Sequence, residues 1–557
     1  MKSPKRQFFL FLLLFFVVNV LQSAYTGLLE DEAYYWVWSN HLAWGYYDHP
    51  PMVAFFIWLG GLVFDGELGV RIISALSFVL MLVFMWNTIE DKEKENHVAL
   101  FFLVVVSIVF LQVYGFISTP DTPLLLFTSV FFYFYKRFLQ HDSIRNSLFL
   151  GFAMAALLYS KYHGILIIGF AALSNLKILL NTRFWVAGIF GLALFTPHLI
   201  WQYENGFPTF VYHLKERGDD AYRFMFTLNQ FINAVAVVGI TFPVIYGAFW
   251  KKKATGPLEK SFKFTVFGFF LFFLFSSFRS QPQAQWLSAM LVPMAIFIFP
   301  YFIHHIKARK WLYRLGLAQL VLIIAARIFF VSPSLSQITL EPHLADTWVP
   351  QVKEKTGGSP LVFINSYQNA SVYAFCTGIE THAFGIPDGR NSQYLLLDTE
   401  SEMQGRSIYV VGKQLKKNQF LVNKNGLDLY SCRIDPFRTY EKMECLIEAE
   451  SIEMTRGQEI RIPFKLINTY DKAIDFKNIR LKGVFQKRRK MAFEEIELSF
   501  PNLKSLKAGE TKNLEAVFEV PAQLEEEKIT FRIGASFEGL PAGLQGNKVL
   551  VNFTPNQ

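Results

Sequence analysis

Long apolar runs separated by short polar segments fill the chain up to about residue 332, and the remainder mixes apolar and polar positions as ordinary soluble protein does. Many of the runs are near the length that crosses a bilayer as a helix. We expect about eleven spans of this kind, near residues 8–24, 69–89, 97–116, 122–137, 146–160, 164–181, 184–201, 227–249, 262–278, 285–303 and 311–332.

Basic residues alternate between the connections of these spans. Lys and Arg gather in segments 91–94, 136–145, 177–183, 251–253 and 307–314. The positive-inside rule places those segments in the cytoplasm. The unusual polar clusters then share the opposite side, in segments 31–51, 118–123, 160–164, 201–223 and 279–286. We read the first run as an uncleaved anchor, although a cleaved signal peptide is an alternative.

The part after the last span reads as two soluble units. Residues 335–440 combine strand patterns at 360–365 and 407–412 with a helix near 366–377, which predicts a small α/β domain. Residues 441–557 contain alternating segments at 458–466, 514–520 and 528–533, which is typical of an immunoglobulin-like β-sandwich. We therefore expect a membrane domain over 1–334 and, with an odd number of spans, a tail on the side of the polar clusters.

Composition supports the membrane interpretation and excludes some partners. Of the 557 residues, 52% are hydrophobic and 18% are charged, and the net charge of +9 is divided among short clusters rather than one basic face. That distribution argues against nucleic acid. The three cysteines, Cys376, Cys432 and Cys445, lack metal-finger spacing and allow at most one disulfide. No glycine-rich nucleotide loop is present in the sequence.

Acidic, basic and aromatic side chains in the polar connections indicate chemistry on a lipid-linked phosphate. Transfer of a sugar from a polyprenyl phosphate needs a base for the acceptor proton, cations for the departing phosphate and an apolar groove for the lipid. Asp31 is the candidate base, and Glu32 and Asp121 are further catalytic candidates. The candidates for the donor phosphate are His49, Lys161, Tyr162, His163, Arg279 and Trp286, and those for a divalent metal ion are Asp48 and His213.

Simpler interpretations exist for several of these residues. Asp31 and Glu32 could cap an interfacial helix, and Asp121, between two prolines, could cap the span that follows it. Lys161 could extend its ammonium group to the lipid headgroups. His213 could be an ordinary solvated histidine, and tryptophan and tyrosine accumulate at any membrane interface.

Four segments together resemble a known family. These are Asp31-Glu-Ala-Tyr-Tyr-Trp, Gly45-Tyr-Tyr-Asp-His-Pro-Pro-Met52, Thr119-Pro-Asp-Thr-Pro-Leu124 and Ser160-Lys-Tyr-His-Gly164. They are similar to the bacterial branch of the protein O-mannosyltransferases, family 39 of the GT-C glycosyltransferases, which is related to the lipid A aminoarabinose transferases. The resemblance covers about residues 1–330 and is most specific in the first polar connection.

The resemblance implies a polytopic α-helical inner-membrane enzyme of GT-C fold with its active site and tail in the periplasm. It implies a polyprenyl-phosphate sugar donor, inversion at the anomeric carbon, and a lipid, glycan or protein as acceptor. Asp31 matches the family's base, and Asp48 with His49 matches the pair that closes the first connection. The related aminoarabinose enzymes have lysine where this chain has His49, so Lys161 becomes the candidate for the permanent charge. A polytopic transporter or flippase is the alternative function.

Overall fold

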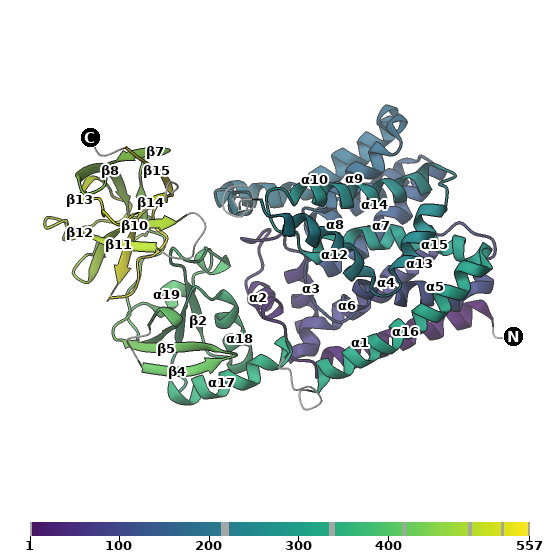
Figure 1. The fold of residues 1–557 in the computed structure, drawn as a ribbon, viewed down its shortest axis with the longest axis horizontal. Helices are drawn as coiled ribbons and strands as arrows, with labels where there is room; N and C mark the ends of the chain where they lie inside the picture. The colour runs from purple at the N-terminus through teal and green to yellow at the C-terminus, as the bar shows by residue number, and fades with distance from the viewer. Residues whose placement is uncertain are drawn as a thin grey trace. The chain divides into compact units, whose positions relative to one another are not determined.

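The protein is described here from a computed structural model, which describes residues 3–212, 222–332, 340–415, 419–487, 493–524, 529–537 and 539–554. The chain divides into two compact units, Met1–Pro342 and His343–Gln557. The first is built from helices and the second mainly from strands (Figure 1). Each unit is described by itself.

Helices make up the whole described framework of the first unit. They are α1 (Pro4–Tyr25), α2 (Glu30–Ser39), α3 (Met52–Gly61), α4 (Gly66–Thr88), α5 (Val98–Val106), α6 (Val109–Val113), α7 (Asp121–Gln140), α8 (Ile144–Ser160), α9 (Gly164–Leu173), α10 (Thr182–Glu204), α11 (Pro208–Val211), α12 (Phe224–Val238), α13 (Phe242–Lys251), α14 (Pro257–Ser276), α15 (Leu291–His304) and α16 (Ile306–Val331), with 3₁₀ turns η1 (Lys94–His97), η2 (Leu176–Leu180) and η4 (Ala284–Met290).

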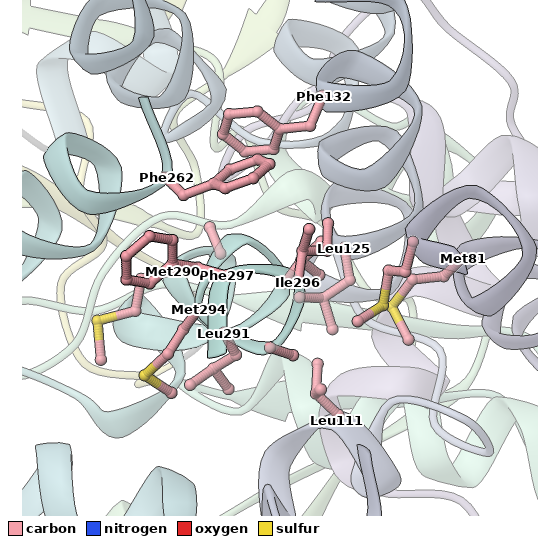
Figure 2. Close-up of a cluster of buried hydrophobic side chains, with 14 of the residues drawn as sticks. Met81, Leu111, Leu125, Phe132, Phe262, Met290, Leu291, Met294, Ile296 and Phe297 are labelled. Atoms are coloured by element: carbon pink, nitrogen blue, oxygen red, sulfur yellow. The ribbon is translucent and has the colours of Figure 1, made fainter. Parts of the chain in front are cut away.

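Helix α15 with the preceding turn η4 is the central element of this unit. Of its most apolar window, 83% is buried inside the protein, as expected for a helix that is hydrophobic on every side. Figure 2 shows Met290, Met294 and Phe297 of this segment within the buried cluster. Beside them, Phe132 of α7 meets Phe262 of α14 edge to face, with ring centroids 5.1 Å apart. Helices α4, α5, α7, α13, α14 and α16 pack against α15.

Helices α1 and α16 lie alongside each other at the periphery of the unit (Figure 1). Only 17% and 11% of their apolar windows are buried, which leaves most of both helices for lipid. The inner face of α1 packs its phenylalanines on α4 and α5, with Phe11 stacked on Phe102 at 4.7 Å. Arg327 of α16 also donates to Asn19 Oδ1 at 2.8 Å. The first helix is thus packed into the unit, as a retained anchor would be.

The predicted span 227–249 is wrong as a single helix, because α12 and α13 meet at 98°. Gly239 ends α12 with φ +84°, a conformation that favours glycine. A side chain there would also collide with Gln319, whose amide donates to the Val238 carbonyl at 2.8 Å and accepts from the Ile240 amide at 2.9 Å. The side chain of Gln319 satisfies the backbone groups that the break leaves open.

The expected count of about eleven spans is not confirmed. Five described helices are long and apolar enough to cross a membrane singly, or six when the bent pair counts as one span. The predicted span 97–116 is divided into α5 and α6, and α8 and α9 are apolar but shorter. Three described helices of this unit were missed: α2 within the predicted first connection, α3 directly after it, and α11 within the predicted connection 201–223. The helical character is confirmed, whereas the exact count is not.

Strands of the second unit form two regions. A mixed sheet of order β2-β1-β3-β5-β4 is accompanied by α17 (Leu344–Lys355), α18 (Tyr367–Thr377) and α19 (Thr399–Met403). Sheets β11-β10-β14-β15-β7, β13-β8-β6 and β12-β9 follow. The strands are β1 (Leu361–Ile364), β2 (Thr381–Phe384), β3 (Ile408–Gly412), β4 (Gln419–Lys424), β5 (Leu427–Ile434), β6 (Glu444–Leu446), β7 (Ser451–Met454), β8 (Glu459–Ile467), β9 (Ile474–Asp475), β10 (Ile479–Lys487), β11 (Phe493–Leu498), β12 (Ser505–Leu506), β13 (Thr511–Glu519), β14 (Ile529–Phe537) and β15 (Val549–Phe553).

These two regions share one buried core. A single apolar cluster extends from Val362 in β1 to Val551 in β15, and Phe384 meets Phe537 edge to face at 6.3 Å. The sheet-rich character of the tail is as expected, while the division at residue 440 stays a prediction. The three cysteines are all free thiols.

A polar cluster is enclosed within this tail. His382 in β2 bonds Glu441 through Nε2 and Thr399 through Nδ1, and its side chain is 1% exposed. Nearby, Glu400 accepts a hydrogen bond from the Tyr470 hydroxyl at 2.6 Å. Burial lowers the pKa of His382, but the charge of Glu441 outweighs it, so that the pKa lies above its usual value. Burial also raises the pKa of Glu400.

We expect the tail to lose stability as the pH rises above the ordinary pKa of histidine. A group whose pKa is raised by folding stabilises the fold below its unfolded pKa, and that contribution is lost as the pH passes the folded value. The raised pKa of Glu400 also makes the fold less stable as the pH rises. The positive charge of Lys442 lowers the pKa of His382 and so opposes the effect of Glu441. Hydrogen exchange of residues 381–384, corrected for its intrinsic pH dependence, should show weaker protection above neutral pH. In His382→Gln this dependence should flatten, and an unchanged pH profile in that variant would contradict the assignment.

Candidate active site

Glu32 and Asp31 lie next to each other on α2 but in opposite environments. Asp31 is exposed, whereas Glu32 is completely buried. Arg71 of α4 donates to Glu32 through Nε at 2.8 Å and through Nη2 at 2.5 Å. The backbone amides of Ser118 and Leu29 donate to the same carboxylate at 2.8 and 3.0 Å. Four donors thus satisfy Glu32, so its geometry favours a structural role over the catalytic one that the sequence analysis also considered.

The first connection folds back on itself through its aromatic residues. Tyr34 of α2 donates its hydroxyl to Asp48 Oδ2 at 3.0 Å, and Asp48 is 6% exposed. Trp38 stacks on Tyr46 at 4.5 Å, and the Tyr46 hydroxyl donates to the Trp38 carbonyl at 3.0 Å. His49 is half-buried, with its ring 6.4 Å from that of Tyr35. The two ends of the connection that resemble the family motif are therefore held together.

Asp121 and Lys161 form a buried ion pair between two further connections. Lys161 Nζ lies 2.8 Å from Asp121 Oδ2, and their side chains are 7% and 5% exposed. Ser288, in turn η4, donates to the other Asp121 oxygen at 2.7 Å. The N-cap of α7 is Pro120, and Asp121 is the first residue of the helix, so Asp121 is not its capping residue. The ammonium group of Lys161 is paired with Asp121, so the alternative of an extended headgroup contact also fails.

A hydrogen-bond chain connects the turn after α8 to the first connection. The Tyr162 hydroxyl bonds His198 Nε2 at 2.7 Å, and His198 Nδ1 bonds the Trp44 carbonyl at 2.7 Å. Gln202 donates to the Tyr162 hydroxyl at 2.9 Å and to Thr209 at 2.8 Å. Thr209 in turn donates to the Tyr46 carbonyl at 3.0 Å. Tyr162 thus positions neighbouring segments through its hydroxyl group.

The other candidate residues are His163, Trp286, Arg279 and His213, and the structure describes the first three. The His163 ring lies 6.4 Å from that of Trp286, and both rings contact Phe273 of α14. Arg279 is exposed on the turn after α14. His213 lies outside the residues that the structure describes.

A metal site is not assembled by the residues that the structure describes. Within those ranges, no three His, Cys, Asp or Glu side chains are grouped to hold an ion. His213, the second metal candidate, lies outside those ranges, so the metal ion stays a prediction.

Several residues that organise this site were missed from the sequence. They are Arg71, His198, Gln202, Thr209 and Ser288. Arg71 and His198 lie inside apolar helices, where an ionisable residue is costly unless it has a partner or a function. That signal was present in the sequence. No comparable signal marks Ser288 or Thr209.

Residues 48–201 match the sequence profile of the dolichyl-phosphate-mannose-protein mannosyltransferases, a span that includes Asp48, Asp121 and Lys161. This segment of the chain is therefore similar to that family. Among solved structures, ArnT from Cupriavidus metallidurans in its apo state has a TM-score of 0.55 and 14% identity, covering 77% of this chain and 98% of that one. The structure of ArnT from the same organism bound to undecaprenyl phosphate has a TM-score of 0.54 and 14% sequence identity. That match covers 76% of this chain and 97% of the ArnT chain.

The similarity at this identity is one of fold, and it confirms the predicted GT-C architecture with a sheet-rich C-terminal region. The apolar helices and this fold indicate an integral membrane protein. A search of curated protein sequences found no match.

Removal of one partner of the buried Glu32–Arg71 pair should destabilise the first unit strongly. Glu32→Gln leaves the Arg71 charge without its counter-ion, and breaking such a pair costs about 3–5 kcal/mol. The loss of stability is measured as the fall in melting temperature of the purified full chain, with size-exclusion chromatography as the readout of unfolding. Asp65→Asn is the matched control, because Asp65 is an exposed acid beside the start of α4. Equal melting temperatures for the two variants would contradict the structural role of Glu32.

Proposed function

We propose that the protein is an inverting membrane glycosyltransferase that moves a sugar from a polyprenyl phosphate to an acceptor of the cell envelope. The observation that carries this proposal is that the family match, over residues 48–201, overlaps part of a connected polar site. Hydrogen bonds join α2, the start of α7, the turn after α8 and the turn η4, which are far apart in sequence. The acceptor belongs to the class of lipids, glycans or protein hydroxyl groups.

Asp31 is the base in this proposal. Its carboxylate is exposed, while the neighbouring Glu32 is fully occupied by Arg71 and two backbone amides. Asp31 removes the proton of the acceptor hydroxyl or amine, and the acceptor atom forms a bond to the anomeric carbon. The bond from that carbon to the phosphate oxygen breaks, and the polyprenyl phosphate leaves with the electron pair. One displacement from the opposite face inverts the anomeric centre.

Cationic groups stabilise the charge on the departing phosphate. Arg279 is exposed and permanently charged, and His49 is half-buried beside the aromatic residues of α2. Lys161 has its charge paired with Asp121, so we assign it mainly to holding that acid in place. Support for a lipid-phosphate ligand comes from the ArnT structure, which contains undecaprenyl phosphate.

The proposal includes an orientation of the protein in the membrane. Basic residues at 251–253 and 307–314 lie in the cytoplasm under the positive-inside rule. Asp31 and the tail then lie on the periplasmic side of a bacterial inner membrane.

Asp31→Asn should abolish transfer while leaving the fold intact. The amide cannot accept the acceptor proton, and loss of a general base lowers rates by roughly 10²–10⁴-fold. Membranes containing the protein, supplied with a radiolabelled polyprenyl-phosphate sugar and an acceptor extract, should release free polyprenyl phosphate, and the variant should not. Asp65→Asn, the exposed control acid, should keep full activity.

Full activity of a folded Asp31→Asn protein would show that Asp31 is not the base. A wild-type protein that moves the lipid-linked sugar across vesicles without releasing polyprenyl phosphate would instead support the transporter or flippase alternative.

A further inference from the structure

The chain returns to the start of α2 after its last long helix. The side chain of Glu341, which belongs to the first unit, accepts a hydrogen bond from the Glu30 backbone amide, with Oε1 2.9 Å from the nitrogen. Glu30 is the first residue of α2, and the opening amides of a helix have no acceptor within the helix itself. A carboxylate 311 residues away in sequence therefore caps the helix that carries Asp31.

A close backbone contact holds this return in place. Gly27, just before α2, lies directly against Pro342, and a Cβ atom at Gly27 would come within 2.2 Å of the Pro342 carbonyl oxygen. Backbone approach this close needs a residue without a side chain. The Gly27 carbonyl also accepts from Arg71 at 2.9 Å. The segment before α2 is thus fixed both by Pro342 and by the arginine that holds Glu32.

Glu341 adds a negative charge to an end of α2 that is already acidic. Burial, together with the charges of Glu30, Asp31 and Glu32, holds the pKa of Glu341 above its usual value, although the hydrogen bond from the Glu30 amide acts against this rise. The charge of Glu32 is balanced by Arg71. Because repulsion between like charges is mutual, Glu341 also makes Asp31 hold a proton more tightly.

Two opposite fields therefore act on Asp31. The amino-terminal end of a helix carries partial positive charge, which stabilises a carboxylate in the first turn and weakens it as a base. A neighbouring negative charge has the contrary effect. A general base works best when its pKa lies near the working pH, well above the ordinary value for aspartate. The charge of Glu341 thus favours proton removal by Asp31, while its hydrogen bond keeps α2 in place.

We propose that Glu341 is a positioning residue for the transfer reaction, which caps α2 and makes Asp31 a stronger base. The inference rests on the proposed function, because it takes Asp31 as the base. It gives a role to a residue beyond the last membrane helix, outside the matched residues 48–201.

The pH dependence of transfer tests this role. The initial rate of polyprenyl phosphate release is measured on the purified full chain in phospholipid nanodiscs, with the same radiolabelled donor and acceptor extract as for Asp31→Asn. Glu341→Gln keeps an oxygen that accepts from the Glu30 amide but removes the charge. Asp31 then loses its proton more easily, so the acidic limb of the profile should move to lower pH by roughly half a unit.

Glu341→Ala removes the charge and the cap together. Its acidic limb should move in the same direction, and its plateau rate should also fall by roughly fivefold, the change expected for the loss of a helix cap. Asp65→Asn should leave both the limb and the plateau unchanged. A purely structural cap predicts that Glu341→Gln matches the wild type at every pH. That result would overturn the proposal, as would a full plateau rate in folded Glu341→Ala protein.

A second measurement separates this inference from the proposed function. A water-soluble carbodiimide reacts with the protonated carboxyl group, so the pH midpoint of Asp31 labelling, located by peptide mass spectrometry, reports its proton affinity without any turnover. The midpoint should be lower in Glu341→Gln than in the wild type. A shifted midpoint in a protein that releases no polyprenyl phosphate would contradict the proposed function alone. An unchanged midpoint in an active protein would contradict the role of Glu341 alone.

Discussion

The buried carboxylate of Glu32 is the constraint on which the proposed catalytic end of the first unit depends. A carboxylate without water is unstable unless charges and donors surround it. Here the donors come from α4, from the chain before α2 and from the segment before α7. Adjacent residues on a helix are separated by about 100°. Glu32 is held inward, whereas Asp31, on a neighbouring face of the helix, is exposed.

The hydrophobic pattern of the sequence predicted where the long helices lie, but it did not predict where helices break or where short helices occur. Apolar runs mark α4, α7, α10 and α16, because each needs an apolar face for lipid or for α15. The right-angled break after α12 depends on Gln319, which is 79 residues away from the Ile240 amide that it accepts from. A window of neighbouring residues contains no such information. The same applies to α3, a helix too short to be recognised by length.

The sequence supplied candidate residues for the site but not the pairs that they form in the structure. Residue type and placement in polar connections were enough to select Asp31, Asp48, Asp121 and Lys161. Their roles depend on partners that are distant in sequence: Arg71 is 39 residues from Glu32, and Ser288 is 167 residues from Asp121. One sequence cannot show such pairs. It therefore ranked Glu32 with Asp31, although the structure gives the two carboxylates opposite surroundings.

The pairing of Lys161 also changes how the phosphate charge is balanced. An ammonium group already bonded to a buried carboxylate contributes little net field to a second anion, because the two charges of the pair largely cancel beyond a few ångströms. Using Lys161 for the phosphate would also leave Asp121 buried and unpaired, which is costly. A cation that is not committed in this way is required. Under the proposed function, the exposed guanidinium of Arg279 is therefore a better candidate for the leaving phosphate than the buried lysine.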